Sequence, residues 1–321
     1  MVVVTKKRLK LQRKPSGIMF HHFHGGKHKK CQGSISCEEL EAIINSIPRQ
    51  RIVNANEWIS KAEGNRFNGD EVCLTFDDSL RCQFDVALPV LEKYKITAFW
   101  FLYTSIYEGV EERLEIYRRF RHEFFNDMDE FYEFFFLYLK KTLADNVFKE
   151  KMKNFDPSHY LKHCTYLTAN DKKFRFVRDE VLSTASYTHF MDEIILLKGG
   201  RIRNLAEGLW LTRRQVKYLA DHGHEIGMHS HTHPTKLSQL SLLDQKVEFE
   251  NNIRVLKKLT GQTPRSVSYP NNSFNKDTLD VLRSLDTKVG FRASSDVAEN
   301  SSLQFARHNH VHLLQQLIAC P

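Results

Sequence analysis

The sequence lacks any regular arrangement of cysteines. Six cysteines are spread over 321 residues, and no two of them form a C-x-x-C pair. A disulfide framework of the kind that holds small secreted modules together is therefore excluded. We expect reduced thiols with no part in the chemistry of the protein.

Long hydrophobic runs are also absent. The longest aromatic run, FYEFFFLYL at 131–139, is too short to span a bilayer. The first residues, MVVVTKKRLK, turn basic after three valines and contain neither the apolar stretch nor the cleavage site of a signal peptide. These features predict a cytoplasmic protein with no transmembrane segment.

Acidic residues are missing from the beginning of the chain. Nine basic residues precede Glu38, which is the first acid, so much of the net charge of +8 is local. A basic arm at 1–15 could bind nucleic acid or anionic lipid, although short basic termini are usually solvated. A nucleic-acid or membrane-surface module is therefore a weak alternative, and nucleic acid is not an expected partner.

Strands and helices alternate over much of the chain. The segments 71–79 and 97–102 are typical of buried strands, and the residues between them have helical spacing. A strand, a helix and a strand in this order predict a parallel crossover. The same alternation resumes at 211–261, so the fold class is α/β.

The segment between these regions has a different composition. Residues 106–208 are dense in Glu, Lys, Arg, Phe and Tyr, carry few turn signals and are predicted to be helical. We expect an inserted helical subdomain there, in which the aromatic side chains form a core. The remaining parts, 16–105 and 209–321, are expected to form one α/β domain.

Three histidines alternate in the segment MHSHTHP at 228–234. An extended strand would place His229, His231 and His233 on one face, but a turn after His229 would bring residues i and i+4 together. His229 and His233 are therefore the better pair of metal ligands. Alone, such a pair is only moderately specific, since many histidine pairs lie on surfaces or in satisfied cores.

Two adjacent acids end a predicted strand and strengthen the metal hypothesis. Asp77 and Asp78 follow the apolar residues of 71–76, where neighbouring carboxylates are costly unless neutralised. Two histidines and one aspartate that leave an open position suit a metal that activates water, and the second aspartate could accept a proton from that water. A helix N-cap would explain one aspartate but not two.

The order of these motifs resembles the polysaccharide deacetylase family, also known as the NodB-homology or carbohydrate esterase family 4 type. The resemblance rests on LTFDDS, on the strand and helix that follow it, and on LADHGHEIGMHSHTHP, and it covers residues 17–103 and 209–312. It implies a distorted (β/α) barrel and metal-dependent hydrolysis of N-acyl groups on amino sugars.

The resemblance also implies a role for each matching residue. Asp77 falls on the general base, whereas Asp78, His229 and His233 fall on the metal ligands. The segment SVSYPNN is similar to a motif whose backbone N–H binds the oxyanion, here near Asn271. The segment IMFHHFH is similar to an opening strand that places His21 at the rim of the substrate site.

The sequence departs from the family at several positions. Ser79 replaces the usual glycine after the two acids, and Ser268 replaces an arginine that often holds the base. The family's usual general acid is missing, and ARHNHVHLL at 306–314 is the nearest counterpart. It offers Arg307 as a substitute charge partner or substrate contact, and His308 or His310 as the acid. Strand alternation puts both histidines on the face opposite Arg307.

These observations predict a hydrolase that removes an acetyl or formyl group from an amino sugar. Zinc suits the ligand set, and cobalt, nickel, iron or manganese would fit as well. An unexported enzyme is expected to act on an amino sugar, nucleotide sugar or lipid-linked precursor of a bacterial surface glycan. The alternative is a noncatalytic metal-binding or sugar-binding member of the family.

Overall fold

A computed structural model describes residues 9, 11–142, 145–162, 167–296 and 301–318. The larger part of the expected basic arm at 1–15 lies outside these residues. Among the described residues, no helix is both long and apolar enough to cross a membrane.

Seven parallel strands form one sheet in the order β6-β5-β4-β3-β2-β1-β7. The strands are β1 (Ser16–Phe20), β2 (Val72–Phe76), β3 (Phe99–Leu102), β4 (Glu225–Met228), β5 (Ser266–Ser268), β6 (Val289–Phe291) and β7 (Ala306–Asn309). Phe291 of β6 pairs in parallel with Phe305, which directly precedes β7. The two edges of the sheet thus meet, and the expected (β/α) barrel is confirmed as a nearly closed one.

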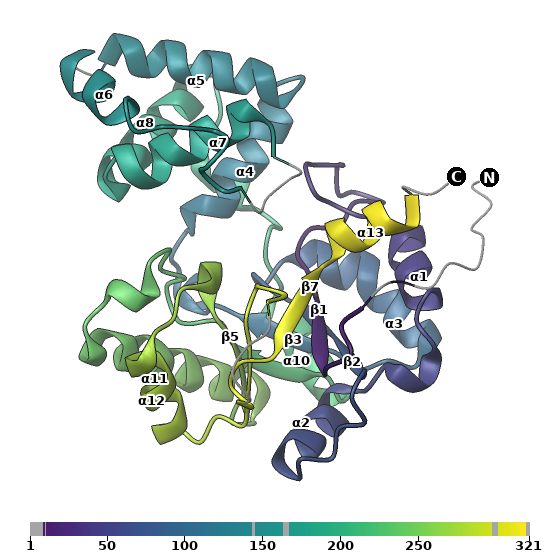
Figure 1. Cartoon of the computed structure of the whole chain (residues 1–321). Coiled ribbons are helices and arrows are strands. Elements are labelled where there is room, and N and C mark those ends of the chain that lie inside the picture. The colour runs from purple at the N-terminus through teal and green to yellow at the C-terminus, as the bar shows by residue number, and fades with distance from the viewer. Residues whose placement is uncertain (1–8, 10, 143–144, 163–166, 297–300, 319–321) are drawn as a thin grey trace. The chain divides into compact units, whose positions relative to one another are not determined.

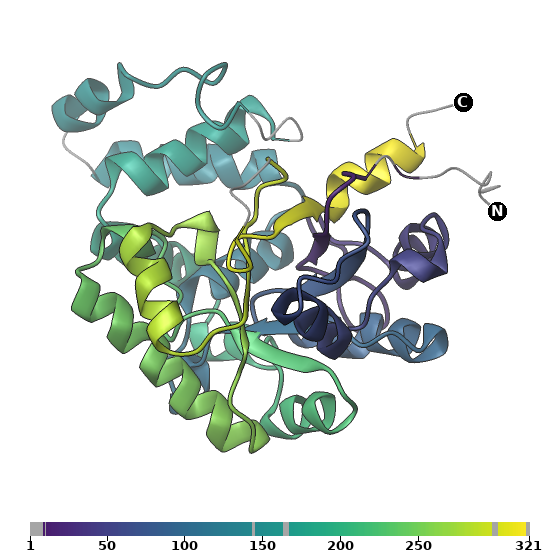
Figure 2. The ribbon, with the colours of Figure 1, turned by 60° about the horizontal axis from the view of Figure 1, so that its bottom comes forward.

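Helices surround the strands of this barrel in both views (Figures 1 and 2). They are α1 (Cys37–Asn45), α2 (Ala55–Glu63), α3 (Leu88–Tyr94), α10 (Arg213–Asp221), α11 (Leu242–Thr260), α12 (Lys276–Ser284) and α13 (His310–Ile318). Short turns of 3-10 or π helix occupy Arg49–Arg51, Gln83–Ala87, Ser105–Glu108, Leu237–Gln239 and Pro270–Asn272. Because the strands are parallel, the loops after their carboxyl ends meet at one edge of the sheet.

The interior of the barrel is packed with aromatic side chains. Phe291 lies 5.0 Å from Phe99 and 6.0 Å from Trp58, measured between ring centroids. Cys73 is buried in the same cluster. These side chains fill the interior with a hydrophobic core.

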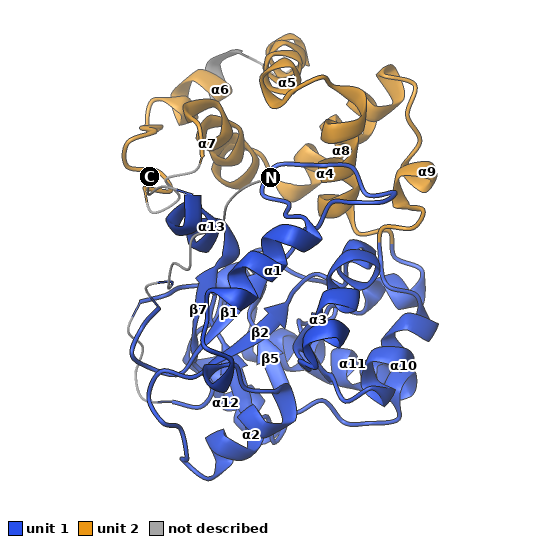
Figure 3. Ribbon diagram, turned by 90° about the vertical axis from the view of Figure 1, so that its right-hand side faces the viewer, with its two compact units in different colours: residues 1–110, 210–321 blue, residues 111–209 orange. Residues whose placement is uncertain are grey.

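The chain divides into two compact units (Figure 3). Residues 1–110 and 210–321 form unit 1, which contains the barrel, and residues 111–209 form unit 2. Unit 2 is helical: α4 (Arg113–Phe124), α5 (Met128–Thr142), α6 (Asp145–Met152), α7 (Ala169–Phe176), a π turn at Val177–Val181, α8 (Thr184–Leu197) and α9 (Ile202–Ala206). Phe120, Phe131, Phe135 and Phe174 are buried in its core.

Candidate active site

The two acids occupy a tight turn after β2. The backbone N–H of Asp77 donates to Phe20 O at 3.1 Å and so continues the pairing of β2 with β1. Asp78 and Ser79 then adopt left-handed conformations, with φ of 77° and 59°. Residues with a Cβ lose about 1–2 kcal/mol in this region, which explains why glycine suits the position of Ser79. The Ser79 hydroxyl donates to Tyr103 O at 3.2 Å and helps to hold the turn.

The histidine segment also turns sharply, directly after β4. Ser230 and His233 have φ of 59° and 56°. The backbone N–H of His233 donates to the Ser230 hydroxyl at 3.1 Å, which closes the turn. The rings of His229 and His233 consequently lie with their centroids 5.0 Å apart.

His231, between these two histidines, faces away from them. Its Nδ1 lies 2.9 Å from the Thr104 hydroxyl, and its Nε2 lies 3.4 Å from a carboxylate oxygen of Glu108. Its carbonyl accepts hydrogen bonds from the backbone of Thr104 and Ser105. His231 thus ties this loop to the segment that follows β3.

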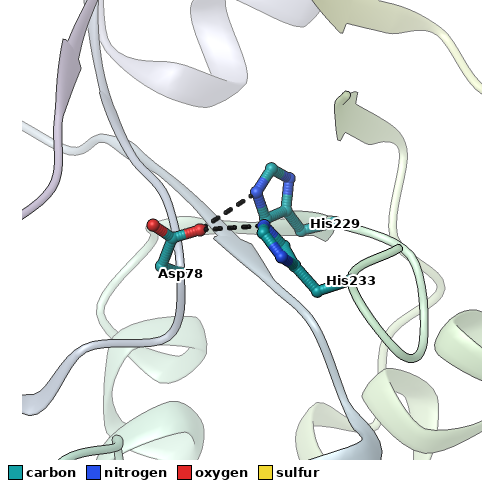
Figure 4. A group of neighbouring side chains, drawn as sticks. All are labelled: Asp78, His229 and His233. Carbon is teal, nitrogen blue, oxygen red and sulfur yellow. Dashed lines mark ion pairs between the residues drawn. The ribbon is translucent and has the colours of Figure 1, made fainter. Parts of the chain in front are cut away.

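Asp78, His229 and His233 bring three ligand atoms together (Figure 4). Asp78 Oδ1 lies 3.2 Å from His229 Nε2 and 3.3 Å from His233 Nε2. Ligands about 2.1 Å from a tetrahedral zinc ion are separated by roughly 3.4 Å. The residues therefore fit a divalent cation of this kind.

Further contacts orient these ligand atoms. His229 Nδ1 donates to Ser268 O at 2.8 Å, so Nε2 is the nitrogen that faces Asp78. A hydrogen bond of this type commonly fixes the tautomer of a metal-binding histidine. Burial raises the pKa of Asp78, but hydrogen bonds from His229 and His233 outweigh burial and place the pKa well below its usual range.

Arg307 is the partner of Asp77. Arg307 is 1% exposed and Asp77 is 2% exposed. The two guanidinium nitrogens donate to the two carboxylate oxygens, each at 2.8 Å. The Ser268 hydroxyl donates to Asp77 Oδ2 at 3.1 Å and accepts from Arg307 at 2.7 Å. Arg307 therefore contacts the carboxylate from within the barrel as the charge partner of Asp77, and its contact with substrate stays a prediction.

The position of Arg307 depends on a small residue in the neighbouring strand. Gly17 of β1 pairs with Arg307 of β7, and a Cβ added at Gly17 would lie 2.9 Å from Arg307 Cγ. The absence of that side chain gives the arginine its path through the interior. Burial raises the pKa of Asp77, but the charges of Arg307 and His229 outweigh it and leave the pKa below its ordinary value.

His21 follows β1 and faces both carboxylates. Its Nε2 lies 3.9 Å from Asp77 Oδ2 and 3.8 Å from Asp78 Oδ2. The side chain is 28% exposed, in contrast to the buried residues around it. His21 is therefore a side chain that contacts both the solvent and the acid pair.

Asn271 lies in the turn after β5, at the same edge of the sheet. It is exposed and has a left-handed backbone with φ of 51°. Asn272, which follows it, accepts a hydrogen bond from Ala293 N at 2.8 Å and so fixes the turn to the segment after β6. The oxyanion role of the Asn271 N–H remains a proposal.

The structure does not support His308 or His310 as the general acid. His308 receives a hydrogen bond at Nε2 from Gln12 N at 3.4 Å, and burial followed by the charge of Arg51 lowers its pKa. His310 is buried, with Nδ1 3.0 Å from Met19 O and Nε2 2.9 Å from Gly33 O. Each nitrogen of His310 thus lies within hydrogen-bond distance of a backbone carbonyl, although a neutral ring can donate to only one of them, and burial lowers its pKa to about 4.

Gln83 was not predicted from the sequence. Its side chain is fully buried, and its Nε2 donates to His21 O at 2.8 Å and to Asp77 O at 2.6 Å. Gln83 thereby joins the ends of β1 and β2. Its position six residues after Asp77 was the only available signal, and spacing alone does not reveal a side chain that turns back toward the strand ends.

Comparisons with known proteins are consistent with this arrangement. The sequence profile described as polysaccharide deacetylase matches residues 64–126 and 187–290, just over half of the chain. The unmatched internal part, 127–186, is shorter than the insertion expected at 106–208. No curated protein matches the sequence.

Solved structures share the fold at low sequence identity. The deacetylase PplD of Streptococcus pyogenes, in complex with acetate, has a TM-score of 0.51 and 17% identity over 95% of this chain and 99% of its own. IcaB from Ammonifex degensii has a TM-score of 0.54 and 14% identity over 96% and 97%. A de-N-acetylase from Aggregatibacter actinomycetemcomitans has a TM-score of 0.53 and 12% identity over 94% and 99%.

Proposed function

Because the chain belongs to the polysaccharide deacetylase family, we propose that it hydrolyses the N-acyl bond of an amino sugar with the help of a divalent cation. One observation carries this proposal: the three ligand atoms of Asp78, His229 and His233 converge beside a second carboxylate, Asp77, which has its own buried arginine. One acid is thus available to hold a cation, and the other is available to accept a proton.

A cation held by Asp78, His229 and His233 would supply Lewis acidity toward the acyl carbonyl and toward water. Zinc suits one carboxylate and two imidazoles, as do cobalt, nickel, iron and manganese. Asp77 accepts the proton of the attacking water, and Arg307 and Ser268 hold its carboxylate ionised and fixed in orientation. The backbone N–H of Asn271 is proposed to donate to the developing oxyanion.

His21 takes the place of His308 and His310 as the proposed general acid. A leaving amine must be protonated as the C–N bond breaks. His21 Nε2 lies within 4 Å of both carboxylates and is open to solvent, whereas both nitrogens of His310 contact backbone carbonyls. We therefore propose that His21 contacts the leaving amine, in addition to lying at the rim of the substrate site as the resemblance implies.

The substrate is proposed to be an acetylated or formylated amino sugar. A more specific proposal is that this amino sugar is a cytoplasmic nucleotide sugar or a lipid-linked precursor of a bacterial surface glycan. Both forms present the same scissile bond to the site, so the hydrolytic roles given above do not depend on the choice between them.

The test combines metal content with turnover. Purified protein is loaded with zinc, cobalt, nickel, iron or manganese and incubated with acylated amino sugars and their nucleotide forms, and the free amine is measured by mass spectrometry. His233→Ala is expected to lose both the metal and activity. His231→Ala, the matched control from the same loop, is expected to keep the metal, because His231 faces Thr104 and Glu108.

The results would separate an enzyme from a noncatalytic relative. Amine produced by wild-type protein and not by His233→Ala supports hydrolysis. Metal bound at one equivalent with no amine from any substrate or metal would instead favour a sugar-binding protein.

A further inference from the structure

We propose that the loop at residues 21–35, called the basic loop below, binds a phosphate or phosphodiester group carried by the amino-sugar substrate. This inference rests on the proposed function, because it assigns a substrate class to the same site. Apart from His21, the loop consists of residues that take no part in the hydrolytic roles given above.

The basic loop begins at the candidate active site. Its first residue is His21, whose ring faces Asp77 and Asp78. Gln83 joins the His21 and Asp77 carbonyls, and Phe23 N donates to Cys82 Sγ at 3.4 Å. The loop is therefore packed against the segment that follows the two acids.

The basic loop carries no acidic residue. Its fifteen positions hold three lysines and four histidines. The nearby acid Asp85 is shared by Lys27 at 3.0 Å, His28 at 2.9 Å and Arg81 at 3.2 Å. One carboxylate thus faces two cations and one imidazole, so it does not neutralise the positive charge of the basic loop.

Lys29 and Lys30 add to this surplus. Both are exposed, and neither forms an ion pair within the part of the chain that the structure describes. Some exposed lysines on helices pair with an acid one turn away, as in Lys217–Asp221, Lys246–Glu250 and Lys276–Asp280. Lys29 and Lys30 form no such pair, so their charges are available to an anionic ligand.

Internal hydrogen bonds hold the basic loop in shape. Gly25 and His28 exchange backbone hydrogen bonds of 3.0 Å, and His24 N donates to Ile35 O at 2.9 Å. The Ser34 hydroxyl lies 2.9 Å from His24 Nδ1 and donates to Cys31 O at 2.7 Å. An ordered loop loses less conformational entropy when its side chains bind a ligand.

Phosphate chemistry suits these groups. Ammonium groups bind phosphate as point charges, and imidazoles can donate further hydrogen bonds to its oxygens. A sugar phosphate carries its acylamino group and its anion on the same ring, so one end can occupy the acid pair while the other faces the basic loop. A nucleoside diphosphate and a lipid phosphate share this chemistry and differ in what lies beyond the phosphate.

The experiment measures kcat/KM of the zinc-loaded protein for four probes. Methyl N-acetylglucosaminide is neutral, and the charged probes are N-acetylglucosamine 1-phosphate, UDP-N-acetylglucosamine and a prenyl diphosphate-linked N-acetylglucosamine. Wild-type protein is expected to favour at least one charged probe over the neutral one by about tenfold or more at low salt, with less preference at high salt. The favoured charged probe identifies the source of the phosphate.

The variants test the loop itself. K29Q/K30Q is expected to lower this preference by about tenfold, the effect of a few weak charge pairs. K93Q/K95Q removes two charges at the end of α3, where the chain enters β3 at the edge away from the site, and is expected to leave the preference unchanged. Equal values for charged and neutral probes in wild-type protein, or an equal loss in the two variants, would overturn the proposal.

A binding measurement separates this proposal from the proposed function. If no probe is hydrolysed, the catalytic proposal fails, and calorimetric titration of N-acetylglucosamine 1-phosphate then tests the loop alone. Binding that weakens about tenfold in K29Q/K30Q and not in K93Q/K95Q supports the loop without hydrolysis. Absence of binding to wild-type protein, or binding that is equal in both variants, contradicts it.

Discussion

At the scale of single residues, the two neighbouring aspartates have different surroundings. Asp77 accepts hydrogen bonds from Arg307 and Ser268 inside the barrel, whereas Asp78 faces His229 and His233. Consecutive residues on a strand point to opposite faces, and the left-handed turn at Asp78 redirects its side chain toward the histidines. This local geometry gives two identical residue types two different proposed roles.

Replacing Asp77 by Asn tests its role as the base. The amide cannot accept a proton, so we expect kcat to fall by roughly 10²- to 10⁴-fold, the usual contribution of a general base. Metal content, measured by mass spectrometry of the bound ion, is expected to stay at the wild-type level because Asp78, His229 and His233 remain. An unchanged rate would remove Asp77 as the base.

The same substitution has a predictable effect on stability. It leaves the Arg307 guanidinium buried without its carboxylate, and removal of one partner of a buried ion pair costs about 3–5 kcal/mol. Urea unfolding at neutral pH measures this loss. The kinetic comparison is therefore made at a temperature where the variant remains folded.

Replacing His21 by Gln tests the proposed general acid. Glutamine cannot supply a proton to the leaving amine, so kcat is expected to fall by about 10²-fold or more. The defect should be smaller for an acyl aryl amine, whose leaving group needs less protonation. An equal defect for both substrates would indicate that His21 only contacts substrate. His308→Gln serves as the control, because His308 contacts Gln12 and neither of the two acids.

Some of this site could be predicted from local sequence and some could not. The pair at i and i+4, His229 and His233, converges because Ser230 turns the chain, and both residues lie within one short segment. Arg307 reaches Asp77 only because β7 pairs with β1 and Gly17 lies opposite it. That proximity depends on sheet order, which the residues around Arg307 do not encode.

At the scale of elements, the end of β7 separates His308 from His310. The strand ends at Asn309, whose side chain accepts from Val311 N at 2.9 Å, and α13 begins at His310. The two-residue alternation of a strand therefore stops before His310. Strand alternation along ARHNHVHLL at 306–314 would instead put His308 and His310 on one face.

A buried histidine joins β3 to β4 and makes stability depend on pH. His224 Nδ1 accepts from Ala98 N at 3.0 Å and from Trp100 Nε1 at 3.1 Å, so this nitrogen is unprotonated in the folded protein. Burial, followed by the charge of His222, lowers the pKa of His224 to about 4. Below pH 6.5 the unfolded chain gains a proton that the folded protein does not bind.

The expected loss of stability follows from this difference. The contribution of His224 is fully present above pH 6.5 and decreases as the pH falls toward 4, by about 2 kcal/mol at pH 5. Urea unfolding of wild-type protein and His224→Gln at pH 7.5 and pH 5 measures it. The variant is expected to be less stable at pH 7.5. Its free energy of unfolding should, however, decrease between pH 7.5 and pH 5 by about 2 kcal/mol less than that of the wild-type protein. The same decrease in both proteins would contradict the assignment.

At the scale of the whole molecule, all candidate site residues belong to unit 1. They lie within 1–110 and 210–321, whereas residues 111–209 form a unit with an aromatic core of its own. The alternation of strands and helices predicted the α/β class because it repeats along the chain, whereas the barrel was implied by the resemblance to the deacetylase family. The composition of 106–208 predicted helices, but their packing depends on contacts between distant residues, such as Phe131 with Phe174.

This division predicts that the core of unit 2 can be weakened without loss of the metal site. Phe174 is buried, and its ring lies 5.3 Å from Phe131 and 5.0 Å from Phe135, so Phe174→Ala is expected to destabilise unit 2 by about 3–5 kcal/mol. Hydrogen exchange measured by mass spectrometry should then show faster exchange in 111–209 while β1 to β7 keep their protection. Metal content should not change, because no ligand atom belongs to unit 2.

Phe291→Ala, in the barrel core, should produce the reverse pattern of exchange. Faster exchange throughout both units in either variant would show that the two units unfold together.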